Sequence, residues 1–379
     1  MQMEKIFSIL MIGIAISACS STEKTIDSSL KPVTRAVIAY VFPGNLVLES
    51  DEIAAGKLTH VNYAFANIQD GEMVEGYEAD SANFVVLNRL KKDNPSLKIL
   101  VSVGGWGWSG GFSDMALTKE SRTRFIQSAL AFIERHRLDG LDIDWEYPGL
   151  PGAGNTHRPE DKENFTLLLK ECRSALDAAD ESKHYLLTIA AAASSDFLEK
   201  TNMQEASQYL DMVNLMTYDF AGEWDDAVRH HANLYPSEYY ELGNSVSETV
   251  SRFIKVGVPA EKMVVGVPFY GRGWRNCTKV NDGIGQSGDG LSNVNLSYRN
   301  LKTNYLSDSK YKQGWDDSAK APYLFNEEER IFITYENPRS LHLKCGFVKD
   351  NNLKGVMFWE YFGDYDEELL SVISGEMIR

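Results

Sequence analysis

Eight short apolar or β-branched runs recur along this chain, and the stretches between them are long enough to hold a helix. The runs lie at residues 36–42, 60–65, 97–103, 140–145, 186–193, 212–218, 263–269 and 355–359. Two of the intervening stretches, 121–135 and 163–176, carry the spacing of apolar residues that is typical of a helix. Strands that alternate with helices in this number predict an α/β fold, a (β/α)8 TIM barrel.

The seventh and eighth runs are separated by more chain than a single crossover needs. Residues 273–338 contain glycine-rich turns and a strand-like stretch at 330–335. We therefore expect a small α+β insertion at 273–338, between strands 7 and 8. The predicted catalytic barrel then consists of residues 35–272 and 339–379.

The first residues are typical of an export signal. Lys5 precedes an apolar run at 6–16, and small residues lead from there to Cys19. The run is short for a membrane span, which takes about 20 residues. Its end resembles the bacterial lipobox, in which the cysteine receives lipid and becomes the new N-terminus. We expect a signal peptide at 1–18, a lipidated Cys19, a tether at 19–34 and an exported bacterial lipoprotein anchored in the cell envelope. The alternative is an ordinary secretory signal whose cysteine is incidental.

Composition narrows the choice of partners. The formal charge is −16, from 38 basic and 54 acidic residues, which argues against nucleic acid because phosphates call for a basic face. Cys172, Cys277 and Cys345 stand far apart and form no metal-binding grouping, so we expect three buried free thiols. The membrane would be contacted through the N-terminal lipid alone, and we expect a monomer.

Three carboxylates follow one another on the predicted fourth strand. Side chains alternate along a strand, so Asp142, Asp144 and Glu146 share the face toward the barrel interior, and the apolar residues between them face the helices. Mutual repulsion should keep a proton among the three acids and raise the pKa of at least one of them. Glu146 comes last, at the strand end where barrel enzymes carry catalytic groups. A protonated Glu146 predicts a general acid.

The same acids could instead bind a divalent cation, as oxygen-rich clusters do. However, no acidic or histidine residue stands at a comparable place on a neighbouring strand to complete a ligand shell. His230 and His231 lie past the sixth strand without ligand spacing, and we interpret them as surface or cleft residues. We therefore expect no metal and no cofactor.

These motifs together resemble the chitinases of glycoside hydrolase family 18. The matching patterns are Ser-x-Gly-Gly at 102–105, Asp-Gly-x-Asp-x-Asp-x-Glu at 139–146, Met-x-Tyr-Asp at 216–219, Tyr-Gly-Arg at 270–272 and Val-Met-Phe-Trp at 356–359. The resemblance extends over residues 35–370. It also includes the insertion after strand seven, which larger bacterial members carry.

The resemblance implies hydrolysis of β-1,4 linkages between N-acetylglucosamine units of chitin or its oligosaccharides. Glu146 would protonate the glycosidic oxygen, and the substrate's own N-acetyl carbonyl oxygen would be the nucleophile. Asp144 would orient the acetamido group and share a proton with Asp142, while Tyr218 would donate a hydrogen bond to the acetamido carbonyl. The other implied cleft residues are Tyr40, Phe65, Trp106, Met216, Asp219, Trp224, Tyr270, Arg272 and Trp359, with Trp359 as the floor of the site. For each aromatic residue the alternative is core packing.

The resemblance further implies non-proline cis peptides at Ala64–Phe65, Glu146–Tyr147 and Trp359–Glu360. Two other functions stay open. A lectin on this barrel would bind chitin without cutting it, although such proteins lack the acid that stands here as Glu146. An endo-β-N-acetylglucosaminidase would apply the same chemistry to N-linked glycans, and peptidoglycan fragments are a third class of substrate.

Overall fold

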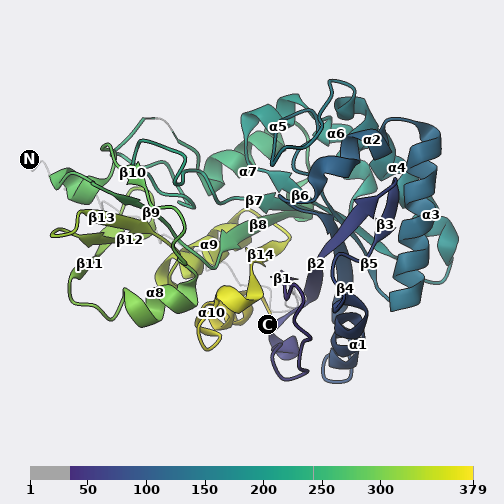
Figure 1. The fold of residues 1–379 in the computed structure, drawn as a ribbon, viewed down its shortest axis with the longest axis horizontal. Helices are drawn as coiled ribbons and strands as arrows, with labels where there is room; N and C mark the ends of the chain where they lie inside the picture. Colours follow the sequence, from purple (N-terminus) through teal and green to yellow (C-terminus); the bar gives the residue numbers. More distant parts are fainter. Residues whose placement is uncertain (1–34, 242, 379) are drawn as a thin grey trace, which may run out of the picture. The chain divides into compact units, whose positions relative to one another are not determined.

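The computed structural model describes residues 35–241 and 243–378, so Cys19, the predicted signal peptide and the tether lie outside the described residues. Within that range, eight parallel strands close into a barrel (Figure 1). They are β1 (Ala36–Val41), β2 (His60–Gln69), β4 (Lys98–Gly104), β5 (Gly140–Asp144), β6 (Leu186–Ala192), β7 (Met212–Met216), β8 (Met263–Pro268) and β14 (Gly355–Trp359). The pairing of β1 with both β14 and β2 closes the ring. Every predicted run forms a strand, and the (β/α)8 barrel is confirmed.

Helices surround the barrel on its outer side (Figure 1). They are α1 (Asp80–Leu90), α2 (Phe112–Ala116), α3 (Lys119–His136), α4 (Asp161–Ala179), α5 (Ser195–Glu199), α6 (Met203–Ala206), α7 (Val246–Lys255), α9 (Pro338–Asp350) and α10 (Glu368–Met377). The two predicted helices lie inside α3 and α4. A capping box of Thr118 and Ser121 starts α3, because each side chain pairs with the backbone N–H of the other. None of the helices in the described ranges is long and apolar enough to cross a membrane.

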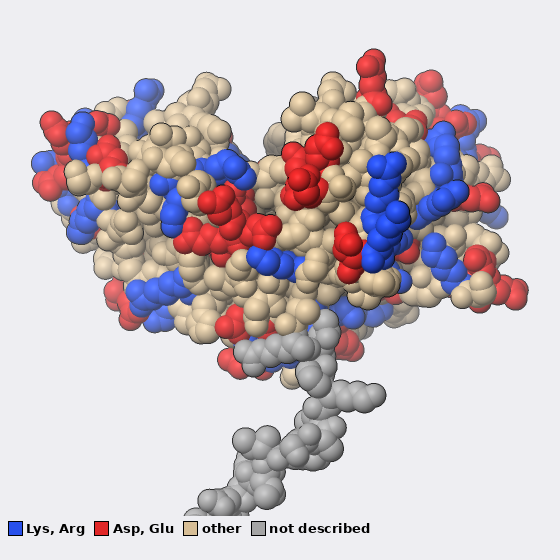
Figure 2. Space-filling model, turned by 90° about the horizontal axis from the view of Figure 1, so that it is seen from below, with Lys and Arg blue, Asp and Glu red and all other residues tan. Residues whose placement is uncertain are grey.

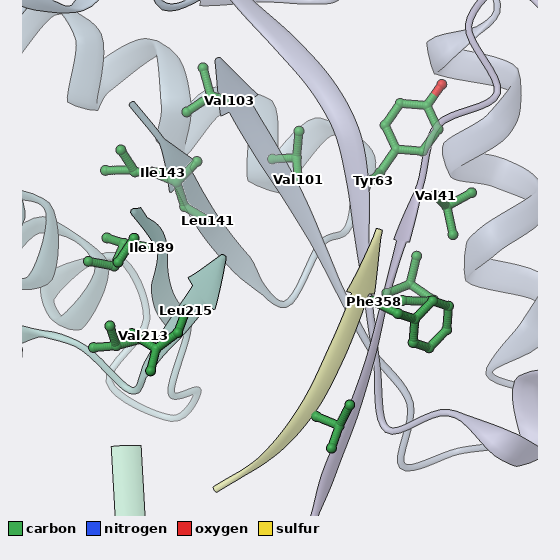
Figure 3. Packing of buried hydrophobic residues seen from close by; sticks show 14 of the residues in the cluster. Val41, Tyr63, Val101, Val103, Leu141, Ile143, Ile189, Val213, Leu215 and Phe358 are labelled. Carbon is green, nitrogen blue, oxygen red and sulfur yellow. The ribbon is translucent and has the colours of Figure 1, made fainter. Parts of the chain in front are cut away.

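The strands bury apolar side chains on their outer faces. Figure 3 shows Val101 and Val103 of β4 beside Leu141 and Ile143 of β5, all in the core between strands and helices. Burying one such side chain is worth about 1.5–3 kcal/mol. The interior of the ring holds a second, smaller cluster that includes Tyr40 and Met357. The predicted division of β5 into an apolar outer face and an acidic inner face is confirmed.

A second sheet follows β8. Its strands are β9 (Arg272–Arg275), β10 (Asp289–Gly290), β11 (Tyr311–Asp316), β12 (Ala321–Asn326) and β13 (Ile331–Thr334), paired antiparallel in the order β10-β9-β13-β12-β11, and α8 (Tyr298–Asn304) accompanies them. Trp274 and Phe332 pack in its core. The predicted domain boundaries at 272/273 and 338/339 stay predictions. Figure 2 shows a hollow between the part of the molecule with this sheet and the part with the barrel.

Two local features were not predicted. Strand β2 runs on to Gln69 and forms a hairpin with β3 (Glu72–Val74), and the turn residues Asp70 and Gly71 both have positive φ angles. The long loop between β7 and α7, residues 217–245, reaches the second sheet. Trp274 Nε1 of β9 donates to Asp225 O over 2.8 Å, and in the segment that leads into β10 Gly288 N donates to Asp226 O over 2.9 Å. This loop carries several of the predicted site residues.

The three described cysteines are in the state that the sequence predicted. Cys172, Cys277 and Cys345 are buried and free, which confirms the predicted thiols. Cys19 is not among the described residues.

Candidate active site

Asp142 lies at the centre of a hydrogen-bond network inside the barrel. It is fully buried. Its carboxylate accepts hydrogen bonds from Tyr40 (2.9 Å), Ser102 (2.7 Å), Thr188 (2.5 Å) and Asn214 Nδ2 (3.2 Å). Burial raises the pKa of Asp142, and these donors act in the opposite direction. Because they come from four different strands, closure of the barrel is what brings them together.

Asp144 is the next inward-facing acid on β5 and has fewer partners. Its Oδ1 is buried and meets no hydrogen-bond partner among the described residues. Burial raises the pKa of Asp144 well above its ordinary value, and the neighbouring charges of Glu146 and Asp142 raise it further. An unpaired buried carboxyl oxygen is costly. Asp144 is therefore suited to hold a proton or to accept a hydrogen bond from a ligand N–H.

Glu146 follows β5 at the mouth of the barrel. Its backbone N–H donates to Ser109 Oγ over 2.8 Å, and the same hydroxyl lies 3.2 Å from Asp144 O. Burial raises the pKa of Glu146 to about 7, with the Asp219 charge adding to the rise. The predicted rise among the three acids is confirmed, but its main cause differs. Mutual repulsion is secondary to burial, since few waters remain to solvate the charged forms.

The glycines of the Ser-x-Gly-Gly motif allow close packing beside β5. A Cβ on Gly104 would lie 2.3 Å from Asp144 O, and one on Gly105 would lie 2.7 Å from the Phe65 ring. Both glycines have positive φ angles, which other residues rarely adopt. The motif therefore brings β4 and Phe65 against the acid-bearing strand.

Aromatic rings surround Trp359, which is half-buried at the end of β14. The rings of Phe65 (5.4 Å, stacked), Phe42 (5.9 Å) and Tyr40 (6.0 Å) lie around its centroid. Tyr40 is buried with its hydroxyl on Asp142, so it contributes to the site from behind. The three predicted cis peptides, Ala64–Phe65, Glu146–Tyr147 and Trp359–Glu360, are all present and confirmed.

Arg272 joins the β7–α7 loop to the second sheet. It donates to Asp219 over 2.9 and 3.0 Å and to Glu223 over 3.0 and 3.1 Å. Its guanidinium lies 5.0 Å from the centre of the Trp224 ring and 5.2 Å from that of Tyr270. Burial alone would raise the pKa of Asp219, but the nearby His231 ring and the hydrogen bonds and charge of Arg272 hold it well below its usual range. Asp219 is thus a fixed negative charge near the acid.

The remaining predicted residues complete the site. Tyr218 lies 6.3 Å from Tyr270, ring to ring, and both Met216 and Tyr218 pack against the interior cluster with Trp359. Trp106 and Trp224 are 57% and 59% exposed, so core packing is the wrong alternative for these two rings. Trp106 lies 6.4 Å from the Tyr147 ring, next to the acid.

Several residues of the site were missed by sequence reasoning. They are Phe42, Ser109, Thr188, Asn214 and Glu223, each in contact with a predicted residue. None stands in a motif, so a single sequence carries no signal for them. The interpretation of His230 and His231 as surface residues is wrong, because both are buried, although His231 lies beside the cleft residues Asp219 and Tyr270. In the described ranges no group of three or more His, Cys, Asp or Glu residues could hold a metal ion.

The fold and the acids at the end of β5 define the class of the protein, a (β/α)8-barrel glycosidase. The model of glycosyl hydrolases family 18 matches residues 36–364, and the chain belongs to this family.

Comparisons with single proteins agree with this assignment. Chitinase A1 of Niallia circulans is 36% identical over 86% of this chain, and the match spans 56% of the relative's own length. Chitinase B of Serratia marcescens is 31% identical over 80% of this chain and 73% of that protein. A solved family 18 N-acetylglucosaminidase from Paenibacillus barengoltzii is 40% identical, with a TM-score of 0.83 over 90% of this chain and 99% of that one.

Proposed function

We propose that this protein hydrolyses β-1,4 linkages between N-acetylglucosamine units of chitin or chitooligosaccharides, with retention of the β anomer. The state of the two neighbouring acids carries the proposal. Burial raises the pKa of Glu146 to about 7, so Glu146 holds a proton below neutral pH, and Asp144 beside it has a buried oxygen without a partner among the described residues. A lectin would need neither feature, and the chitinases among the relatives favour chitin over N-linked glycans.

The chemistry begins with proton transfer. Glu146 gives its proton to the glycosidic oxygen, so the leaving sugar departs as an alcohol. The N-acetyl carbonyl oxygen of the sugar in the site attacks the anomeric carbon and forms an oxazolinium ion. Water, deprotonated by Glu146, then opens the ion from the face that the leaving group occupied. Two inversions at one carbon give net retention.

The neighbouring residues act on the acetamido group. The free oxygen of Asp144 accepts a hydrogen bond from the acetamido N–H. Asp144 thereby stabilises the positive charge that develops on the oxazolinium ring. Asp142, held by four donors, stays fixed beside it and shares the proton. Tyr218 donates to the acetamido carbonyl. The rings of Trp359, Trp106 and Trp224 offer apolar faces on which sugar rings can stack, two of them open to solvent.

The test is digestion of chitin oligomers and of an N-glycosylated protein by the purified chain, with products read by mass and anomers by NMR. We expect cleavage of the oligomers, an initial β product, and no cleavage where the sugar in the site lacks its acetyl group. An initial α product would contradict internal attack, and release of whole N-glycans would favour the endo-β-N-acetylglucosaminidase function instead.

A second candidate is release of single N-acetylglucosamine units from chain ends. It is favoured by the 40% identity to the N-acetylglucosaminidase from Paenibacillus barengoltzii, almost the whole of which this chain covers. An end-labelled hexamer distinguishes the two functions. Early monomer with pentamer indicates removal from an end, whereas early dimer, trimer and tetramer indicate internal cleavage.

The location of the enzyme is also a proposal. The lipobox-like ending at Cys19 supports an exported lipoprotein that acts as a monomer and contacts the membrane through its N-terminal lipid. Such an anchor would hold the catalytic domain at the cell envelope, where oligosaccharides reach it from outside.

A further inference from the structure

Two consecutive histidines in the β7–α7 loop point into different parts of the molecule. His230 and His231 are 1% and 0% exposed. His230 enters the second sheet, where its ring nitrogens lie 3.2 Å from Thr334 Oγ1 and 3.2 Å from Asp316 Oδ2. His231 turns toward the barrel mouth. Two adjacent residues of the loop thus contact the second sheet and the candidate active site, respectively.

His231 contacts the Asp219 turn in two ways. Its carbonyl oxygen accepts a hydrogen bond from Phe220 N over 3.0 Å. Its Nδ1 lies 3.6 Å from Asp219 Oδ1, and its ring centroid lies 5.5 Å from that of Tyr270. Asp219 has a positive φ of 56°, a conformation that costs energy for a residue other than glycine. Such a turn persists only where its surroundings hold it.

The ring of His231 is unusual for a buried histidine. Neither ring nitrogen has a hydrogen-bond partner within 3.5 Å among the described residues, and the contact of Nδ1 with Asp219 Oδ1 at 3.6 Å is long but still lowers the pKa of Asp219. A buried imidazole costs free energy unless a polar group faces it, so its contact with Asp219 explains a histidine here better than packing alone. The nearest polar group to Nδ1 is the carboxylate that also binds Arg272.

The segment around His231 is held rigidly on its other side. The Lys344 side chain of α9 donates to Ala232 O and forms a buried ion pair with Glu336. These contacts, together with those of His230, fix the backbone on both sides of His231, so the ring starts from a defined place beside Asp219.

We propose that His231 is a positioning residue of the active site, whose ring keeps the Asp219 carboxylate turned toward Arg272 and close to the acid Glu146. The inference rests on the proposed function, because it concerns the same acid. Asp219, as a fixed negative charge, helps Glu146 to keep its proton. If the ring is lost, Asp219 is free to turn outward and Glu146 gives up its proton at lower pH.

The other charged groups near these residues limit the interpretation of a pH experiment. Asp219, Arg272, Glu336 and Tyr270 face His231. Asp144, Asp219, Tyr147 and Tyr218 face Glu146. Burial lowers the pKa of His231, so the ring is neutral at and above neutral pH. The alkaline fall of activity therefore reports Glu146 rather than His231.

The experiment compares three variants by the pH dependence of kcat/KM on a chitin oligomer. His231→Phe keeps an aromatic ring against Tyr270 without nitrogens, His231→Gln restores an N–H donor, and Glu163→Gln on the exposed surface of α4 is the control. We expect the Phe variant to move the alkaline limb down by on the order of half a pH unit. The Gln variant should recover part of that shift, and the control should leave the limb where the wild-type enzyme has it.

An unmoved or upward-moved limb in an active His231→Phe enzyme would overturn the inference while the hydrolytic function stands. A crystal structure of the variant gives a second, activity-independent test. Asp219 should lose its paired contacts to Arg272 or its left-handed backbone, and an unchanged Asp219 would overturn the inference. If His231→Phe does not fold, His231→Leu takes its place. An inactive wild-type enzyme would refute the proposed function, and the crystal comparison would still decide the role of His231.

Discussion

At the scale of single residues, the protonation of Glu146 depends on its surroundings. A solvated glutamate ionises near pH 4.3, whereas burial and the Asp219 charge raise the pKa of Glu146 to about 7. Asp142 differs because four donors surround its carboxylate and oppose the effect of burial. The three acids in and just after β5 thus differ in protonation because their contacts differ.

The first prediction concerns Glu146→Gln. The amide keeps the shape of the acid but has no proton to give, so kcat should fall by about 10²–10⁴-fold while chitooligosaccharide binding stays within a few-fold. Single-turnover kinetics and calorimetry measure the two quantities. Glu163→Gln, on the exposed surface of α4, is the matched control and should leave both unchanged. Near-normal turnover in the Glu146 variant would mean that another group is the acid.

The second prediction is the pH profile of the wild-type enzyme. The acid works only while protonated, so kcat/KM should fall as the pH rises through about 7, the pKa of Glu146. The slope should approach tenfold per pH unit, as for loss of one proton from the free enzyme. Initial rates on a soluble oligomer between pH 4 and 9 measure this limb. A limb near the ordinary glutamate pKa would contradict the raised value.

At the scale of elements, the contact between β4 and β5 determines where the acids stand. The two strands pair in parallel from Leu100 to Gly104, which sets Ser102 opposite Asp142 and Gly104 opposite Asp144. The Ser-x-Gly-Gly motif therefore serves the site through its backbone and one hydroxyl. Its glycines leave room for the end of β5 and for Phe65.

The third prediction tests that contact with Gly104→Ala. The new methyl group would lie 2.3 Å from Asp144 O, at a φ of +105°. We expect the free energy of unfolding to fall by about 1–3 kcal/mol, since both overpacking and a strained backbone cost energy. Denaturant titration measures the loss, and kcat should fall with it as Asp144 shifts. Gly107→Ala, where nothing lies within 4 Å, is the control and should change little.

At the scale of the whole molecule, the second sheet and the β7–α7 loop form one wall of the site. Arg272 belongs to β9 of this sheet, yet it binds Asp219 and Glu223 of the loop. His230 and His231 join the same two parts from the loop side. The sheet after β8 thus borders the candidate active site through side chains that contact the β7–α7 loop.

The fourth prediction concerns the anchoring of the chain. If Cys19 receives lipid, Cys19→Ala should abolish labelling by a radioactive fatty acid and move the protein from the membrane to the soluble fraction. Expression in a bacterial host with fractionation and immunoblotting measures both. Ser20→Ala, the next residue, is the control and should remain labelled. Labelling that persists in the Cys19 variant would contradict the lipoprotein proposal.

From the sequence we could predict the eight barrel strands, the shared face of the three acids, the free thiols and, through the family resemblance, the three cis peptides. The strands and the face of the acids follow from the two-residue period of a strand, which is visible in a short stretch of sequence. Only the folded chain shows that Thr188 and Asn214 bind Asp142, that Glu223 shares Arg272 with Asp219, and that His230 and His231 are buried. It also decided that burial outweighs repulsion in raising the pKa of the acids. The reason is that these contacts join residues tens of positions apart, and neither their distances nor the exclusion of water exists until the barrel closes.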